Sequence, residues 1–298
     1  TLGTTVTLSG VNTYTGATTI GAGTLNANST DALGNGSGTN TLIFTGGTLQ
    51  AGGTITSPGT RAVTLTSTGI IETAGNGVSL AGVATGAGGL TKNGAGTLTL
   101  SNTNTYGGTT TINLGTLALG HATNTLPDAG AVTVAGGTLD LGANTDTVGV
   151  VTMSSGSITG AGTLTGTSFG FSGGSSSTNL VGPLTVTGAV GLTGTLTGNA
   201  TVDTGGTLSL NASNVIADAN FVVVQGGGTL AIGTSSDTVA GVQLVNGSIT
   251  GTSGVLTSTS TFDVQNGSVS AILGGGVGLT KTLGTTVTLS GVNTYTGA

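Results

Sequence analysis

The sequence contains no cysteine, no tryptophan and only three prolines in 298 residues, and 4% of its residues are charged. Without cysteine it has no disulfides, no cysteine-bound zinc and no thiol nucleophile. With so little proline it is neither collagen nor a proline-rich linker. The nine acidic and three basic residues form no basic patch, so no nucleic-acid partner is expected.

Long apolar runs and helix signals are also scarce. No apolar run reaches the ~18 residues that a membrane helix needs, so we expect no membrane-spanning segment. Threonine and glycine, the latter with 61 residues, dominate the composition, and both are unfavourable in helix interiors. An apolar content of 35% together with low charge argues against a charge-rich disordered chain.

Short alternating runs predict β-strands along the whole sequence. In each run two apolar residues share one face, and the residue between them is mostly Thr or Ser, which suits a solvated strand face. Asn-Gly pairs at 35–36, 76–77, 93–94, 246–247 and 266–267 predict tight turns. The apolar pairs are Val6 and Leu8, Leu42 and Phe44, Val63 and Leu65, Leu98 and Leu100, Val132 and Val134, Leu139 and Leu141, Leu184 and Val186, Leu208 and Leu210, Val222 and Val224, and Phe262 and Val264.

The tripeptide Gly-Thr-Leu recurs at intervals that predict a β-solenoid. Several of the intervals are roughly 19 to 25 residues, and short strands and turns that recur every ~20 residues are typical of stacked coils. We expect the leucines to stack in a column inside and the threonines to form ladders. At ~22 residues per coil a 281-residue period gives about 13 coils. The tripeptide ends at Leu25, Leu49, Leu98, Leu117, Leu139, Leu164, Leu196, Leu208 and Leu230.

The sequence also contains a repeat with a much longer period than the coil spacing. The segment Thr282–Ala298 repeats Thr1–Ala17 letter for letter, and Thr7–Leu25 has a diverged second copy at Thr99–Leu117. We therefore interpret residues 1–298 as a single solenoid repeat unit with a 281-residue period. Its expected partners are neighbouring copies of the same repeat, joined end to end, with the solenoid continuing between tandem repeats.

The stretch Gly86–Leu117, GAGGLTKNGAGTLTLSNTNTYGGTTTINLGTL, resembles the passenger-associated transport repeat of bacterial autotransporter adhesins. A second stretch, Gly276–Ala298 continued by Thr18–Leu25, is similar to the same repeat. The shared features are the Leu-Thr-Lys, Asn-x-Tyr and Gly-Thr-Leu positions. The resemblance implies a right-handed parallel β-solenoid, exported and held at the cell surface, with no catalytic residues.

Residues capable of chemistry are few and isolated. His121 is the only histidine and is interpreted as a loop residue, because no serine elbow or second ligand accompanies it. Asp146 and Asp237 occupy equivalent repeat positions, and we expect each to accept backbone N–H groups in a turn. Calcium coordination by these two residues is the weaker alternative. We therefore expect no enzyme activity, no catalytic residues and no cofactor.

The sequence thus predicts a structural repeat of an extracellular bacterial fibre or giant surface adhesin, forming a stiff, protease-resistant shaft. The alternative is a binding module in which loops, at Gly170–Thr178 or Asn26–Asn40, hold a host or surface glycan or a receptor. A polysaccharide-processing enzyme would need a cluster of acids, and the sequence offers none.

Overall fold

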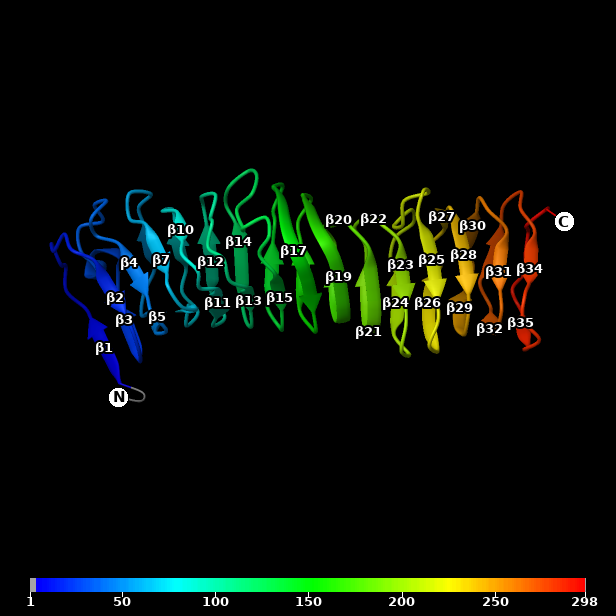
Figure 1. Ribbon diagram of the computed structural model, residues 1–298, viewed down its shortest axis with the longest axis horizontal. Coiled ribbons are helices and arrows are strands. Elements are labelled where there is room, and N and C mark those ends of the chain that lie inside the picture. Colours follow the sequence, from blue (N-terminus) through cyan, green and yellow to red (C-terminus); the bar gives the residue numbers. More distant parts are fainter. Residues whose placement is uncertain (1–3, 298) are drawn as a thin grey trace. The chain divides into compact units, whose positions relative to one another are not determined.

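The structure is a computed structural model and describes residues 4–297. Within these residues the regular structure is 35 strands and one short 3₁₀ turn, η1 (Thr30–Leu33). The strand pairs have parallel registers, and successive coils stack as a parallel β-solenoid (Figure 1). The coils number about 15. The all-β, parallel solenoid prediction is confirmed.

The chain divides into two compact units, and the first comprises Thr1–Val151 with Gly156–Leu164. Its strands follow one another in chain order. They are β1 (Thr5–Leu8), β2 (Thr18–Ile20), β3 (Thr24–Ala27), β4 (Leu42–Phe44), β5 (Thr48–Ala51), β6 (Ile55–Ser57), β7 (Val63–Leu65), β8 (Gly69–Glu72), β9 (Val78–Leu80), β10 (Ala84–Thr85), β11 (Leu90–Asn93), β12 (Thr97–Leu100), β13 (Thr110–Ile112), β14 (Thr116–Leu119), β15 (Val132–Val134), β16 (Thr138–Asp140), β17 (Thr145–Met153) and β18 (Ser157–Thr159).

The second unit comprises Thr152–Ser155 with Thr165–Ala298. The end of β17 and most of β19 belong to it. Its strands are β19 (Thr163–Ser176), β20 (Asn179–Val181), β21 (Leu184–Leu192), β22 (Leu196–Thr197), β23 (Ala200–Val202), β24 (Thr207–Leu210), β25 (Phe221–Val224), β26 (Gly228–Gly233), β27 (Asp237–Val239), β28 (Gly241–Leu244), β29 (Gly247–Gly251), β30 (Val255–Ser258), β31 (Phe262–Val264), β32 (Gly267–Val269), β33 (Ile272–Gly274), β34 (Leu279–Lys281) and β35 (Val287–Leu289).

The leucines of the Gly-Thr-Leu tripeptides form the core of each unit. In the first unit Leu98, Leu117 and Leu139 lie side by side in register on successive coils, and all three are fully buried. In the second unit Leu208 pairs with Leu230 in the same way. Burying such side chains stabilises the fold by roughly 1.5–3 kcal/mol each, so the column predicted from the tripeptide spacing is part of the apolar core.

Threonines between the core residues form the expected ladders on the outer face. Thr91, Thr111 and Thr133 are in register on three successive coils, with half-buried side chains. Close stacking of coils also requires glycine. A Cβ atom on Gly188 would lie 1.8 Å from the Ser172 carbonyl oxygen of the coil before, so a side chain at this position cannot fit without moving the backbone.

The predicted number of coils, about 13, is too low. The coil length assumed from the sequence holds for some coils of the first unit, where Leu49 pairs with Ile71, but others are shorter, since Leu98 pairs with Leu117. The second unit contains shorter coils, because Phe169 pairs with Leu184, and Leu184 in turn pairs with Ala200. These shorter coils lack Gly-Thr-Leu at the regular spacing, and they bring the total to about 15.

The prediction of a loop at Gly170–Thr178 is wrong. Residues up to Ser176 belong to β19, which pairs in parallel with β21 and contains a register shift between Phe171 and Gly173. The glycine and serine content reflects close packing of coils, since a Cβ on Gly173 would lie 2.4 Å from the Ser154 carbonyl oxygen. Phe169 and Phe171 are buried, with their rings 5.8 Å apart at the centroids.

Candidate functional site

The Asn-x-Tyr motif of the first unit connects three successive coils. Asn104 is buried, and its side-chain Oδ1 accepts from the Ala84 N–H of the coil before at 2.8 Å. Its Nδ2 donates to the Thr125 carbonyl of the coil after at 2.7 Å. Because one amide side chain satisfies backbone groups on both neighbouring coils, the motif needs asparagine, which carries both a donor and an acceptor.

The tyrosine of this motif is part of the core. Tyr106 is 0% exposed, and its phenol bonds to the Thr110 hydroxyl at 2.6 Å. The first copy makes the same bond, from Tyr14 to Thr18 at 2.8 Å, but Tyr14 is 38% exposed. The two tyrosines differ in exposure because coils enclose Tyr106 on both sides, whereas Tyr14 lies in the first coil.

A loop of residues 121–130 follows the motif, and Asp146 holds it from the next coil. The Asp146 side chain is 2% exposed, and its Oδ2 accepts from the Leu126 N–H at 2.9 Å. Asn124, in the same loop, has a left-handed backbone with φ of 51°. Asp146 therefore acts as a backbone acceptor that fixes the loop, as the sequence predicted for this position.

The second unit contains an equivalent loop at residues 211–220. Asp237 is buried there, and its Oδ2 accepts from the Val215 N–H at 2.8 Å and from the Ile216 N–H at 3.1 Å. Asn214 is left-handed, with φ of 55°. This pair of loops was not predicted from the sequence, although the motif NTLPDA at 124–129 recurs as NVIADA at 214–219.

Both buried aspartates keep one oxygen without a hydrogen-bond partner, Oδ1 in each case. Burial raises the pKa of Asp146 to about 6, with a smaller rise from Asp128, while backbone N–H groups oppose the shift. Burial likewise raises the pKa of Asp237. Residues 4–297 contain no group of three His, Asp or Glu side chains that could share a metal ion; calcium at these aspartates stays a prediction.

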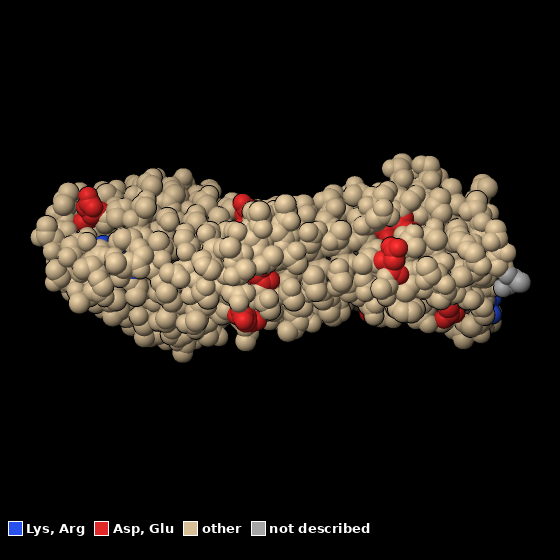
Figure 2. All heavy atoms as spheres, turned by 90° about the horizontal axis from the view of Figure 1, so that it is seen from above, with Lys and Arg blue, Asp and Glu red and all other residues tan. Residues whose placement is uncertain are grey.

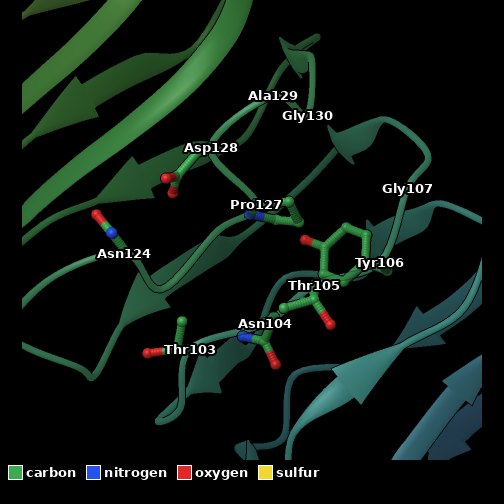
Figure 3. A pocket seen from close by; sticks show the side chains of 10 residues that line it. All are labelled: Thr103, Asn104, Thr105, Tyr106, Gly107, Asn124, Pro127, Asp128, Ala129 and Gly130. Carbon is green, nitrogen blue, oxygen red and sulfur yellow. The ribbon is translucent and has the colours of Figure 1, made fainter.

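An open pocket of about 390 Å³ lies between the tyrosine motif and the 121–130 loop (Figure 3). Figure 3 shows Pro127 beside the Tyr106 ring, with Asp128 and Asn124 on the loop and Thr103 on the facing coil. Asp128 and Thr103 are exposed. The pocket is thus lined by a carboxylate, an amide and a hydroxyl, next to the buried Tyr106.

Two of the three basic residues, Lys92 and Arg61, are buried. Lys92 is 0% exposed and lies in register between Ile71 and Ile112. Its Nζ donates to the carbonyls of Asn93 at 2.9 Å and Gly94 at 2.7 Å, and to the Leu114 carbonyl of the next coil at 2.9 Å. Burial lowers the pKa of Lys92 to about 8, opposed by Glu72.

Arg61 is the second buried cation, and it organises part of the Asn26–Asn40 segment. Its guanidinium donates to Asn40 Oδ1 at 2.8 and 3.0 Å and to the Leu33 and Gly34 carbonyls at 3.1 and 3.0 Å. Burial lowers the pKa of Arg61. Since Leu33 and Asn40 are 0% exposed, these parts of the predicted binding loop are packed inside the unit.

The remaining charges and the histidine form no cluster. Figure 2 shows acidic side chains as separate patches on a largely uncharged face. His121 is half-buried in its loop, where its Nδ1 lies 2.6 Å from the Thr123 carbonyl oxygen, as expected for a loop residue. In the part of the chain that the structure describes, no helix is long and apolar enough to span a membrane.

Comparison with known proteins agrees with the motif positions. A family model described as Passenger-associated-transport-repeat matches residues 3–27 and 90–119, which contain two copies of the tyrosine motif. The adhesin BmaC autotransporter of Brucella suis biovar 1 (strain 1330) is 44% identical over 122 residues, covering 37% of this chain and 4% of that protein. No solved structure matches the chain. The comparisons confirm the resemblance of these segments to passenger-associated transport repeats and autotransporter adhesins.

Proposed function

We propose that the chain is a structural segment of an extracellular bacterial surface adhesin, where it forms part of a stiff shaft. The main support for this is that successive coils pair in parallel and are linked by one motif. In it Asn104 hydrogen-bonds to the coil before and to the coil after, and Tyr106 bonds to Thr110 in the core. The matches to the transport repeat and to an autotransporter adhesin support export and a surface location. The role proposed is mechanical and not catalytic.

The shaft proposal predicts resistance to proteases. Trypsin cleaves only after lysine and arginine, and the three candidates are Arg61, Lys92 and Lys281. Arg61 and Lys92 are buried within coils, and only Lys281 is exposed. We expect trypsin to cut after Lys281 at most, and a broad-specificity protease to leave the body of the chain intact for hours. Rapid cleavage after Arg61 or Lys92, detected by mass spectrometry, would contradict the proposal.

Glycan binding is a second candidate function, and the pocket between the tyrosine motif and the 121–130 loop favours it. Its volume of about 390 Å³ lies in the range of small-ligand sites, and Asp128, Asn124 and Thr103 can bond sugar hydroxyls. We expect saturable binding on a glycan array that Asp128→Ala abolishes, while the matched Asp218→Ala in the other loop leaves it intact. Absence of saturable binding would remove this candidate.

A further inference from the structure

The three copies of the tyrosine motif make complementary parts of one bonding pattern. Asn104 bonds backwards to Ala84 and forwards to Thr125. Asn12, its counterpart in the first copy, bonds forwards, from Nδ2 to the Ala32 carbonyl at 2.8 Å. Asn293, its counterpart in the last copy, bonds backwards, since its Oδ1 accepts from the Leu273 N–H at 2.9 Å. Together the two end copies reproduce the pattern of the middle copy.

The strands show the same complementarity. In the middle copy β11 pairs backwards with β8 and forwards with β13, so that Lys92 lies opposite Ile112. β34, the counterpart of β11, pairs backwards with β31, and among the described residues it has no forward partner. β2, the counterpart of β13, pairs forwards with β4 and is the edge strand of its sheet. Among residues 4–297, β34 therefore lacks a forward partner of the kind that β2 supplies, and β2 lacks a backward partner of the kind that β34 supplies.

Exposure of apolar side chains follows from these open edges. Leu98 is fully buried in the middle copy, whereas its counterpart Val6 is 58% exposed. At the other end Leu289 is 37% exposed, although its counterpart Leu100 is buried. Val6 pairs in register with Leu25 on the following coil. Val287 is the counterpart of Val6 in the repeated sequence, so Leu25 of a second copy would fit beside it in the same way.

Lysine supplies the last element of the pattern. Lys281 is the counterpart of Lys92, and its Nζ already donates to the Leu283 carbonyl, as Lys92 does to Gly94. Lys92 also donates to Leu114 of the next coil, and the counterpart of Leu114 in the first copy is Ala22. Lys281 is exposed because this next coil is not present beside it.

We propose that the surface formed by β34 and β35 binds a second copy of this same sequence, which enters at Thr18 directly after Ala298. Strand β34 then pairs with β2 of that copy, β35 pairs with its β3, and Lys281 donates to its Ala22 carbonyl. This inference rests on the proposed function, because it gives the shaft a means of continuing from one repeat to the next. The occupant is a second copy, since the structure already contains this joint once, around Lys92 and Asn104.

Amine labelling tests the joint, because each copy has only two lysines, one of them the buried Lys92. The chain to compare with the single copy has two copies, with Ala298 of the first followed by Thr18 of the second. Lys281→Arg in the second copy leaves one Lys281, at the joint. We expect that lysine to be labelled at the rate of Lys92, at least about tenfold more slowly than Lys281 in the single copy.

Hydrogen exchange of the same chains gives a second measurement. The amides of Thr18–Ile20 at the joint should become as protected as those of Thr110–Ile112. Fast labelling of Lys281 in a two-copy chain that remains resistant to protease would overturn the joint and leave the shaft proposal standing. Protease sensitivity of the single copy would instead contradict the shaft proposal itself.

Discussion

Replacing Tyr106 by alanine is expected to lower the free energy of unfolding by about 3–5 kcal/mol, the usual effect of removing a buried aromatic side chain. Tyr106 is fully buried, and its loss also leaves the Thr110 hydroxyl without its 2.6 Å partner. The matched change, Tyr14→Ala, removes the same residue from the same motif and the same kind of bond, to Thr18. Since Tyr14 is 38% exposed, we expect an effect of about 1 kcal/mol.

Urea unfolding followed by far-ultraviolet circular dichroism measures both effects. Tyr106→Phe, which keeps the ring and removes the hydroxyl, should lower the free energy of unfolding by only about 1 kcal/mol and so separates packing from hydrogen bonding. If Tyr106→Ala were no more harmful than Tyr14→Ala, the middle motif would not be enclosed by coils on both sides.

The second large effect is a loss of stability as pH rises. The pKa of Asp146 is about 6 in the folded protein, above its ordinary value of 3.8. Between these two values Asp146 keeps its proton in the folded state, whereas the unfolded chain has released it. The stabilisation that comes from protonated Asp146 is therefore complete below about pH 4 and is lost as pH rises through 6. A difference of about two pKa units corresponds to about 3 kcal/mol.

Asp146→Asn tests this, because asparagine keeps a side-chain oxygen for the Leu126 N–H and removes the charge. We expect the variant to lose less free energy of unfolding than the wild type between pH 4 and pH 7.5. Asp237→Asn, the matched change in the second unit, should act in the same direction, since burial raises that pKa too. If both variants showed the same dependence of unfolding free energy on pH as the wild type, burial would not raise the pKa of these carboxylates.

Much of the core of this fold can be predicted from the sequence, because core leucines recur at the regular spacing of the Gly-Thr-Leu tripeptides. Leu117 and Leu139 end successive matching tripeptides and pair directly. Composition alone was misleading at 170–178: glycine and serine there fit a strand packed closely between coils, and the buried Phe169 and Phe171 were the better indicators. A count of coils needs the shorter ones, where Gly-Thr-Leu does not recur at the regular interval: Leu164 and Leu196 end successive tripeptides 32 residues apart.

The buried polar groups could not be predicted in the same way. Three of the bonds of Lys92 go to carbonyl groups, which every residue has, and one of these carbonyls belongs to Leu114 on another coil; the fourth goes to the Thr73 hydroxyl. No side-chain pattern marks such a site, so sequence alone favours an exposed lysine. The two aspartate-held loops are different: their recurrence at 124–129 and 214–219 was visible in the letters, but only the structure shows that Asp146 and Asp237 bind them.

The short sequence distance between paired residues on neighbouring coils also affects how the chain folds. Leu25 meets Leu49 and Phe169 meets Leu184, so pairing partners along these ladders are separated by a single coil of sequence. Closing a segment of ~20 residues carries a modest entropic cost. Contacts between residues that are close in sequence also form faster than contacts between distant residues. Each coil can therefore form on the one before it, so that folding can propagate along the chain from coil to coil.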